Sequence, residues 1–385
     1  MKIDKIEVIP VSVPYKHDEI SSRVSRSGIT EIIVKISTDS GIVGWGESPR
    51  IASADVIQKA IESMIPLILN QDPWKNQLLE NNVYHDSNWQ WSQMTANLAY
   101  GAIDMALWDI YGQETGIPIY KLLGGNLREE VDYFYYLQWD ELDSFIKQCE
   151  EGHEKGYEVF YMKIGLNDEN EEEMLRQVRS IIGYDKKIRI DVNMAWDIPK
   201  AKRLINLWHE KYKLDFVEAP VQIQPIDLMK EIKQSVNASL CVNEGLWQES
   251  EFYNIINNKC ADYLCCSHYF VGSIRKFMHL INYANFLGWK MCKHTHGELG
   301  LTAAIGQHLM LAIPNACDGH QQTAQNMADD ILTEDIPIKN QNKWGIIDKP
   351  GLGVKIDNDK LKFFHNKYQK DGEYLLYGDK FPISN

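Results

Sequence analysis

Residues 188–244 contain three short apolar runs that each end in a carboxylate: IRID (188–191), DFVE (215–218) and LCVNE (240–244). Similar runs lie on either side of them. The full set of expected strands is 131–137, 159–163, 188–191, 215–218, 240–244, 262–267, 289–294 and a weaker one near 316–320. From 163 onward their C-terminal ends recur every 23 to 28 residues, with polar, helix-forming stretches between them. One strand and one helix per interval predict a parallel α/β barrel with its helices outside.

The first 125 residues follow a different pattern, in which strands come first and helices follow. EIIVKIST (31–38) and IVGWGES (42–48) are expected to pair as antiparallel strands across a short turn. Helical patterns cover about 53–69, with Ser53 as a candidate N-cap, and about 92–116. The sequence therefore predicts three parts. These are an α+β domain over 1–125, a barrel over 126–330, and a C-terminal tail over 331–385 that returns to the first domain.

The composition excludes several classes of protein. Of 385 residues, 44% are hydrophobic and 24% are charged, and the formal net charge is -14. Such an acidic surface makes nucleic acid and anionic membrane poor partners. No apolar run approaches the roughly 20 residues of a membrane span, and the N-terminal residues lack the apolar core of a signal peptide. The seven cysteines form neither a disulfide framework nor a zinc spacing, so we expect a cytoplasmic location.

Three carboxylates are expected to meet at one end of the barrel, because active sites of such barrels lie at the C-terminal ends of the strands. They are Asp191, Glu218 and Glu244. Any one of them alone could simply cap a helix. Three together would repel one another strongly, and a hard divalent cation resolves that repulsion. Oxygen ligands suit Mg²⁺, so the pattern predicts a magnesium site.

Two candidate proton carriers flank the three carboxylates. Lys163 ends the second expected strand and His294 ends the seventh, which places them on opposite sides of the metal. Alone, the lysine could be a solvated charge and the histidine a structural residue. Together with a metal they suit abstraction of a proton α to a carboxylate. A nearby cation lowers the pKa of the lysine, and the metal stabilises the enediolate that forms.

With these motifs the chain resembles the enolase superfamily, in its mandelate racemase-like branch, over nearly its whole length. The segments that carry the resemblance are GIVGWGES (41–48), AIDMALWDI (102–110), GIPIYKLLGG (116–125), GYEVFYMKIG (156–165), IDVNMAW (190–196), DFVEAP (215–220), CVNEGLW (241–247), GWKMCKH (288–294) and PGLGVKID (350–357). The resemblance implies a (β/α)7β TIM-like barrel with an α+β capping domain built from the N-terminus and the C-terminal tail.

The same resemblance implies roles for individual residues. Mg²⁺ would be held by Asp191, Glu218 and Glu244, with Asn193 in a supporting position. Lys163 would be the base of this branch, and His294, not His296, would occupy the second base position. The sixth strand, CCSHYFVGS (265–273), lacks the lysine typical of the muconate cycloisomerase-like branch. This favours the branch of racemases and acid-sugar dehydratases.

Three positions depart from the family pattern. Tyr161 stands where a lysine usually binds the substrate carboxylate; it could donate a hydrogen bond, act as an acid or base, or only fill the barrel. Ser267 stands where an aspartate usually pairs with the histidine, so His294 should be a weaker base but a competent acid. His320 stands where a glutamate usually faces the enediolate. It could donate the same hydrogen bond or be an ordinary buried residue.

Other candidates are weaker. Arg23, like Arg26, could pair with a distal carboxylate of the substrate or remain a solvated loop charge. Gln321 and Gln322 could bind sugar hydroxyls, and Glu298 could face the pocket or begin a helix. His268 is expected to point away from the pocket. Trp89 and Trp91 could cover the site or support an oligomer interface.

The sequence therefore favours an Mg²⁺-dependent lyase that dehydrates an acid sugar to a 2-keto-3-deoxy acid. Lys163 would remove the α-proton, and His294, or else Tyr161, would protonate the leaving hydroxyl. One alternative is a racemase or epimerase of a 2-hydroxy acid or amino-acid derivative that uses Lys163 and His294 on opposite faces. Another is a non-catalytic metal-binding protein. The expected partners are a small-molecule carboxylate and, by resemblance, further copies of the chain in a dimer or octamer.

Overall fold

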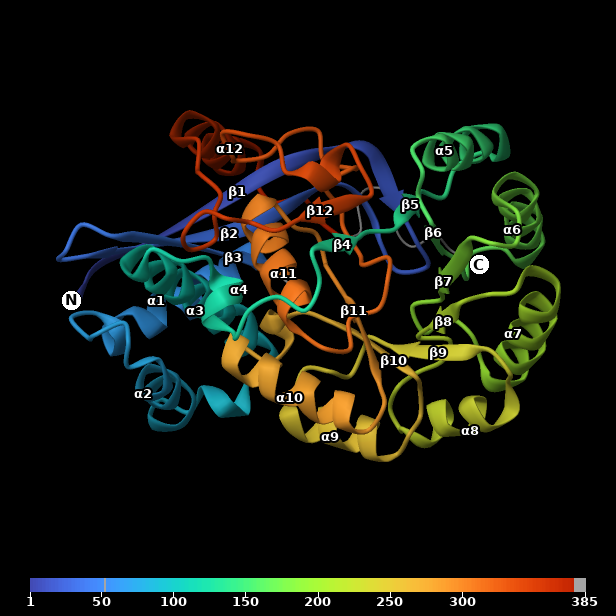
Figure 1. Cartoon of the computed structure of the whole chain (residues 1–385), viewed down its shortest axis with the longest axis horizontal. Helices are drawn as coiled ribbons and strands as arrows, with labels where there is room; N and C mark the ends of the chain where they lie inside the picture. Colours follow the sequence, from blue (N-terminus) through green and yellow to red (C-terminus); the bar gives the residue numbers. More distant parts are fainter. Residues whose placement is uncertain (52, 377–385) are drawn as a thin grey trace.

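The structure is a computed structural model that describes residues 1–51 and 53–376. An antiparallel sheet with its helices lies beside a curled parallel sheet wrapped by helices (Figure 1). The first part contains β1 (Ile3–Ile20), β2 (Ser25–Thr38), β3 (Val43–Pro49), α1 (Ala54–Ile68), α2 (Asn76–Asn81), η1 (Asn82–Asp86), η2 (Trp89–Trp91), α3 (Gln93–Thr115) and α4 (Ile119–Leu122). Its strands pair in the order β1-β2-β3, so the predicted hairpin and both predicted helices are confirmed.

Two glycines allow α3 to lie directly on the backbone of β3. A Cβ atom added to Gly46 would lie 1.9 Å from the carbonyl oxygen of Ala102, and one added to Gly44 would lie 2.1 Å from that of Ala106. Side chains at either position would push the helix away from the sheet, since backbone atoms cannot yield as a flexible side chain can. The close packing that these glycines permit fixes the three-stranded sheet against its longest helix.

The second part is an α/β barrel. Its elements are β4 (Glu130–Asp132), β5 (Tyr135–Leu137), α5 (Leu142–Glu154), β6 (Val159–Lys163), α6 (Asp168–Ile182), β7 (Lys187–Asp191), α7 (Ile198–Tyr212), β8 (Phe216–Glu218), α8 (Asp227–Ser235), β9 (Ser239–Val242), α9 (Glu249–Asn257), β10 (Tyr263–Cys266), η3 (His268–Phe270), α10 (Ile274–Phe286), β11 (Lys290–Lys293) and α11 (Gly300–Ala312). Strands β5 to β11 pair in parallel in chain order, which confirms the predicted barrel architecture. The expected first strand, 131–137, divides into β4 and β5.

The expected eighth strand near 316–320 is not a regular strand. Instead, Ala316 forms one bridge to β11 and His320 forms one bridge to Tyr133, next to β5. Asp318 and Gly319, between them, do not pair with a strand, because the guanidinium of Arg189 binds their carbonyl oxygens. Gly319 also has a φ of +65°, which strand geometry does not allow. The two bridges link the seventh strand to the first and so close the barrel.

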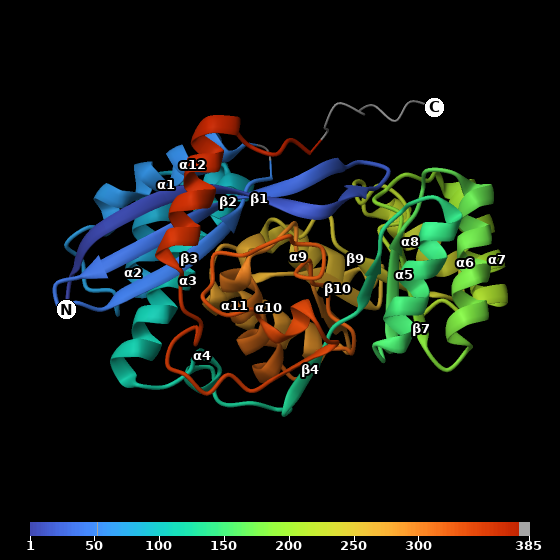
Figure 2. The same ribbon diagram turned by 90° about the horizontal axis from the view of Figure 1, so that it is seen from above.

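The C-terminal residues contact both parts. Strand β12 (Lys343–Gly345), after the short helix η4 (Pro337–Lys339), pairs antiparallel with β4. Helix α12 (Asn358–Asp371) then packs across β1, as seen from above in Figure 2. The stretch VKID (354–357) forms no strand and contributes a single bridge, Leu332 to Ile356. None of the helices in the described part of the chain has the length and apolarity needed to cross a bilayer.

Candidate active site

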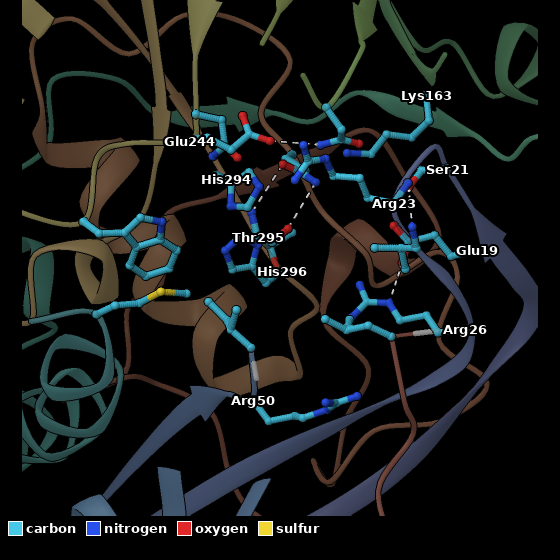
Figure 3. Close-up of a pocket in the computed structure, with 18 residues that line it drawn as sticks. Glu19, Ser21, Arg23, Arg26, Arg50, Lys163, Glu244, His294, Thr295 and His296 are labelled. Atoms are coloured by element: carbon cyan, nitrogen blue, oxygen red, sulfur yellow. Dashed lines mark hydrogen bonds and ion pairs between the residues drawn. The ribbon is translucent and has the colours of Figure 1, made fainter. Parts of the chain in front are cut away.

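A cavity of about 330 Å³ lies between the C-terminal ends of the barrel strands and the first sheet (Figure 3). The barrel strand ends supply its polar floor, with Lys163 at the end of β6, Glu244 after β9 and His294 after β11. The opposite wall comes from residues at the β1–β2 connection and just after β3. A cavity of this size can enclose a small organic acid.

Hydrogen-bonding neighbours link the three predicted metal ligands, of which Glu244 lines the cavity. Asp191 ends β7 and is paired in register with Glu218, which ends β8. The hydroxyl of Tyr161 donates to Asp191 at 2.8 Å and lies 3.4 Å from Glu218, so one atom touches both carboxylates. Asn193 joins Asp191 to Glu244, because its backbone N–H donates to Asp191 at 2.8 Å and its amide donates to Glu244 at 3.3 Å.

The neighbouring residues do not fully neutralise these three carboxylates or satisfy all of their oxygens with hydrogen-bond donors. Within residues 1–51 and 53–376, Glu218 Oε1 and Glu244 Oε2 are buried with no hydrogen-bond partner. Burial and the Asp191 charge raise the pKa of Glu218 well above its ordinary value, and they raise the pKa of Glu244 to about 7. Buried, unsatisfied carboxylate oxygens are costly unless a cation binds them. The oxygen-only donor set fits Mg²⁺.

Lys163 faces the cavity and forms an ion pair with Asp191. Burial alone would lower the pKa of this lysine, but the charges of Asp191 and Glu218 raise it above the ordinary value. The amine is therefore protonated while these carboxylates compensate its charge. A divalent cation bound by the same carboxylates would oppose this rise and favour the neutral amine.

His294 faces the same cavity, and its ring has no carboxylate partner among the residues that the structure describes. Its Nδ1 is buried without a hydrogen bond. The hydroxyl of Ser267 donates to the backbone carbonyl of His294 and not to the ring. Burial, followed by the neighbouring His296 ring, lowers the pKa of His294 well below its ordinary value. The imidazole is thus neutral, and it is a weak base.

Comparison with known proteins places this arrangement in a family. Residues 5–124 match "Mandelate racemase / muconate lactonizing enzyme, N-terminal domain", and residues 144–360 match "Enolase C-terminal domain-like". The chain belongs to the mandelate racemase-like branch of the enolase superfamily. Enzymes of this superfamily depend on Mg²⁺.

Its relatives include enzymes of two reaction types. An N-succinyl-L-Arg/Lys racemase of Bacillus cereus is 28% identical over 378 residues, covering 94% of this chain and 97% of the relative. An arabinonate dehydratase of Saccharolobus solfataricus is 27% identical over 330 residues, covering 84% and 88%. A crystal structure of an enolase from Streptomyces coelicolor superposes with a TM-score of 0.87 at 26% identity, covering 97% of this chain and 99% of the other.

Tyr161, the first departure from the family pattern, contacts the carboxylates and is not one of the residues that line the cavity. Its ring is fully buried and stacks on Phe134 at a centroid distance of 4.4 Å. Burial, and then the charges of Asp191 and Glu218, raise its pKa well above the ordinary value. Tyr161 is therefore a neutral hydrogen-bond donor to the candidate metal ligands.

His320, a further departure, does not line the cavity either, whereas the next residue, Gln321, does. His320 Nδ1 accepts a hydrogen bond at 2.9 Å from the backbone N–H of Lys293, and the ring meets Tyr133 edge-on. The Gln321 side chain bonds the backbone of Thr295, which holds its amide at the cavity. The difference has a simple cause: successive side chains of extended backbone point to opposite sides.

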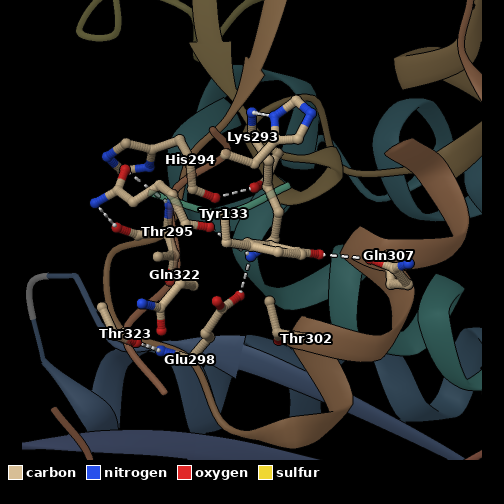
Figure 4. Close-up of polar contacts among 12 residues, drawn as sticks. Tyr133, Lys293, His294, Thr295, Glu298, Thr302, Gln307, Gln322 and Thr323 are labelled. Atoms are coloured by element: carbon tan, nitrogen blue, oxygen red, sulfur yellow. Dashed lines mark hydrogen bonds and ion pairs between the residues drawn. The ribbon is translucent and has the colours of Figure 1, made fainter. Parts of the chain in front are cut away.

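Glu298 also lies outside the cavity lining. It forms a fully buried ion pair with Lys293 at 2.5 Å (Figure 4). Lys293 precedes His294 in the chain and points to the other side of the strand, toward α11, where an added Cβ on Gly306 would meet its side chain at 2.2 Å. His268 is buried and does not line the cavity, as expected for it. Gln322 likewise does not line it and hydrogen-bonds Gln325.

The wall opposite the barrel contains three arginines. Arg23 is exposed and lines the cavity, while Arg26 lines it in an ion pair with Glu19 at 2.6 Å. Arg50 pairs with Glu373. Trp89 and Trp91 do not line the cavity.

Sequence reasoning named His296 only to set it aside in favour of His294, and it did not name several other cavity residues. His296 lies two residues beyond His294 and lines the cavity with it, with the two rings 4.4 Å apart. The period-two spacing of the two histidines was a signal that could have found it. Glu19, Arg50 and Leu376 also line the cavity, but they are far from the barrel strands in sequence, and no local pattern marks them.

Proposed function

We propose that this protein is an Mg²⁺-dependent acid-sugar dehydratase. The observation that carries the proposal is the pairing of two unlike proton carriers at one cavity. Lys163, which lines the cavity, would remove a proton, and within residues 1–51 and 53–376 His294 has no carboxylate that would make it a matched second base. Of the three carboxylates suited to a divalent cation, Asp191 forms an ion pair with Lys163, and Glu244 lines the same cavity as both proton carriers.

Asp191, Glu218 and Glu244 would hold the metal, with Asn193 orienting two of them. When bound, Mg²⁺ would supply positive charge that stabilises the negative charge developing on the substrate carboxylate. The buried Tyr161 hydroxyl would hold Asp191 by donating to it and would keep Glu218 beside it at 3.4 Å.

The reaction proposed for this cavity is a β-elimination of water. The neutral amine of Lys163 takes the proton from the carbon α to the carboxylate, and the electron pair of that C–H bond forms the new C–C double bond. The C–O bond at the next carbon breaks, and the departing hydroxyl takes a proton from His294 and leaves as water. The ring is neutral in the empty site, and the negative charge of a bound substrate would favour the protonated form that donates this proton. The enol then loses its hydroxyl proton and gains a proton at carbon, and so becomes a 2-keto-3-deoxy acid.

Side chains that suit hydroxyl groups surround this centre. Asn193 and Gln321 present amides to the cavity, and Thr295 lies between His294 and His296 on its wall. Amide groups can donate to and accept from sugar hydroxyls, so these residues would orient the substrate's middle carbons. Arg23 would pair with an anionic group at the far end of a longer substrate.

A second candidate is a racemase or epimerase of a 2-hydroxy acid or amino-acid derivative. It is favoured by the extended similarity to the B. cereus racemase. In this case Lys163 and His294 would exchange protons on opposite faces of one carbon. The absence of a carboxylate partner for His294 is the reason that we place it second.

The test is a product screen. The protein, with Mg²⁺ in D₂O, is incubated with mono- and diacid sugars, 2-hydroxy acids and N-acyl amino acids, and proton NMR follows each mixture. A dehydratase yields a 2-keto-3-deoxy acid, and Lys163→Ala abolishes it while the matched control Lys202→Ala, a surface lysine paired with Glu231, does not. Loss of the α-proton signal alone, without a keto acid, would replace the dehydratase by the racemase.

A further inference from the structure

The last described residues of the chain lie at the edge of the cavity. After α12, the segment Glu373–Leu376 runs over β1 and β2 toward the barrel (Figure 2). The backbone N–H of Tyr374 donates to Thr30 at 2.9 Å, and the carbonyl oxygen of Leu376 accepts from the backbone N–H of Ser25 at 2.9 Å. These two bonds hold the segment to β2 at two separate points.

A small residue on β2 makes room for this segment. A Cβ added to Gly28 would lie 2.7 Å from the ring of Tyr374 and 2.6 Å from the carbonyl oxygen of Val13. The Tyr374 ring therefore rests directly on the backbone of β2. Any larger residue at position 28 would displace the ring or the neighbouring strand.

The same segment holds an arginine of the cavity wall. Arg50, whose side chain is only 4% exposed, forms an ion pair with Glu373 at 3.2 Å and donates to the carbonyl oxygen of Tyr374. The Glu373 carboxylate also accepts from the backbone N–H of Ala54 at 2.8 Å, at the start of α1. Glu373 thus fixes both Arg50 and the first turn of the helix that follows it.

Leu376 lines the cavity itself, together with Arg50 and Ile51. The neighbouring Leu375 is 58% exposed and does not line it. We propose that Leu376 is a specificity-determining wall of the active site that contacts the part of the substrate farthest from the metal, and that Glu373 positions Arg50 beside it. This proposal rests on the proposed function for the identity of the substrate, but not for the geometry of the wall.

Adjacent residues provide a matched pair for the first test. Leu376→Cys and Leu375→Cys, each in the whole chain, are treated with an anionic methanethiosulfonate. The native thiols give a low background, because six of the seven cysteines are buried and Cys317 is partly buried. We expect the Leu375→Cys thiol to react at least about tenfold faster, since reactivity follows exposure. Equal labelling rates would refute the proposal that Leu376 forms the wall, and this result does not depend on any measurement of enzyme activity.

The second test uses the substrate found by the product screen. Leu376→Trp should raise KM by about tenfold or more while kcat stays within about threefold, since it removes space and no proton carrier. Leu375→Trp should leave both values unchanged. A silent Leu376→Trp would refute the wall and leave the dehydratase standing. If no acid in the screen reacts while the labelling rates still differ, the wall stands and the proposed function fails.

Discussion

Replacing Glu244 by glutamine should change how the stability of the metal-free protein depends on pH. Burial and the Asp191 charge raise the pKa of Glu244 from 4.5 to about 7. A carboxyl whose pKa is raised on folding binds its proton more tightly in the folded state. Its contribution to stability is therefore complete below about pH 4.5 and is lost as the pH rises through about 7.

The size of this effect follows from the shift. At roughly 1.4 kcal/mol for each tenfold change in proton affinity, a rise in pKa from 4.5 to about 7 corresponds to at most about 3–4 kcal/mol. Glutamine at this position carries no charge at any pH. The difference in free energy of unfolding between wild type and Glu244→Gln should therefore shift by up to about 3 kcal/mol between pH 4.5 and pH 8, in favour of the variant at high pH.

Urea unfolding in EDTA, at pH 5 and pH 8, measures this difference directly. The comparison with the variant cancels the pH dependence of other buried carboxyls, such as Glu47. In Mg²⁺ the order should reverse, because a ligand at about 100 times its Kd stabilises the wild type by about 2.7 kcal/mol and the variant has lost a ligand. If the difference in free energy of unfolding between wild type and Glu244→Gln is the same at both pH values and in Mg²⁺, Glu244 is neither destabilised by burial nor a metal ligand, and the account is refuted.

Other substitutions test separate parts of the structure. Tyr161→Phe should lower Mg²⁺ affinity by about 10- to 100-fold in calorimetric titrations, since it removes the donor that holds Asp191, and an unchanged affinity would leave the ring a packing role only. Gly46→Ala should cost about 3 kcal/mol in urea unfolding, because the new Cβ meets the backbone of α3, and a wild-type unfolding curve would contradict that packing. Glu298→Gln leaves Lys293 buried without its ion pair and should cost about 3–5 kcal/mol, much of it recovered when Lys293→Met is added; a small cost for the single variant would show that the pair contributes little.

Much of the barrel could be predicted from the sequence because its information is local. Each strand repeats an apolar run followed by a polar residue, so the ends of β6, β7 and β8 at Lys163, Asp191 and Glu218 could be placed to the residue. The eighth strand could not be predicted correctly. Its backbone carbonyls are bound by Arg189, a residue about 130 positions earlier, and nothing near residue 318 signals that contact.

The site was predicted unevenly for the same reason. Residues on barrel strands follow from register, but His320 and Gln321 differ by one position, and only the path of the irregular backbone decides which of them reaches the cavity. The opposite wall depends on contacts between distant segments. Arg50 lines the cavity while it is ion-paired with Glu373. The two residues are more than 300 positions apart, and no sequence motif predicts that contact.

Wash-out of the α-proton into D₂O tests the central claim most directly. Acids that react in the screen are followed by proton NMR with wild type and Lys163→Ala, each with Mg²⁺ and again after EDTA. Our account predicts that the α-proton disappears only when both Lys163 and the metal are present. Wash-out by Lys163→Ala at the wild-type rate, or wash-out that EDTA does not stop, would contradict it.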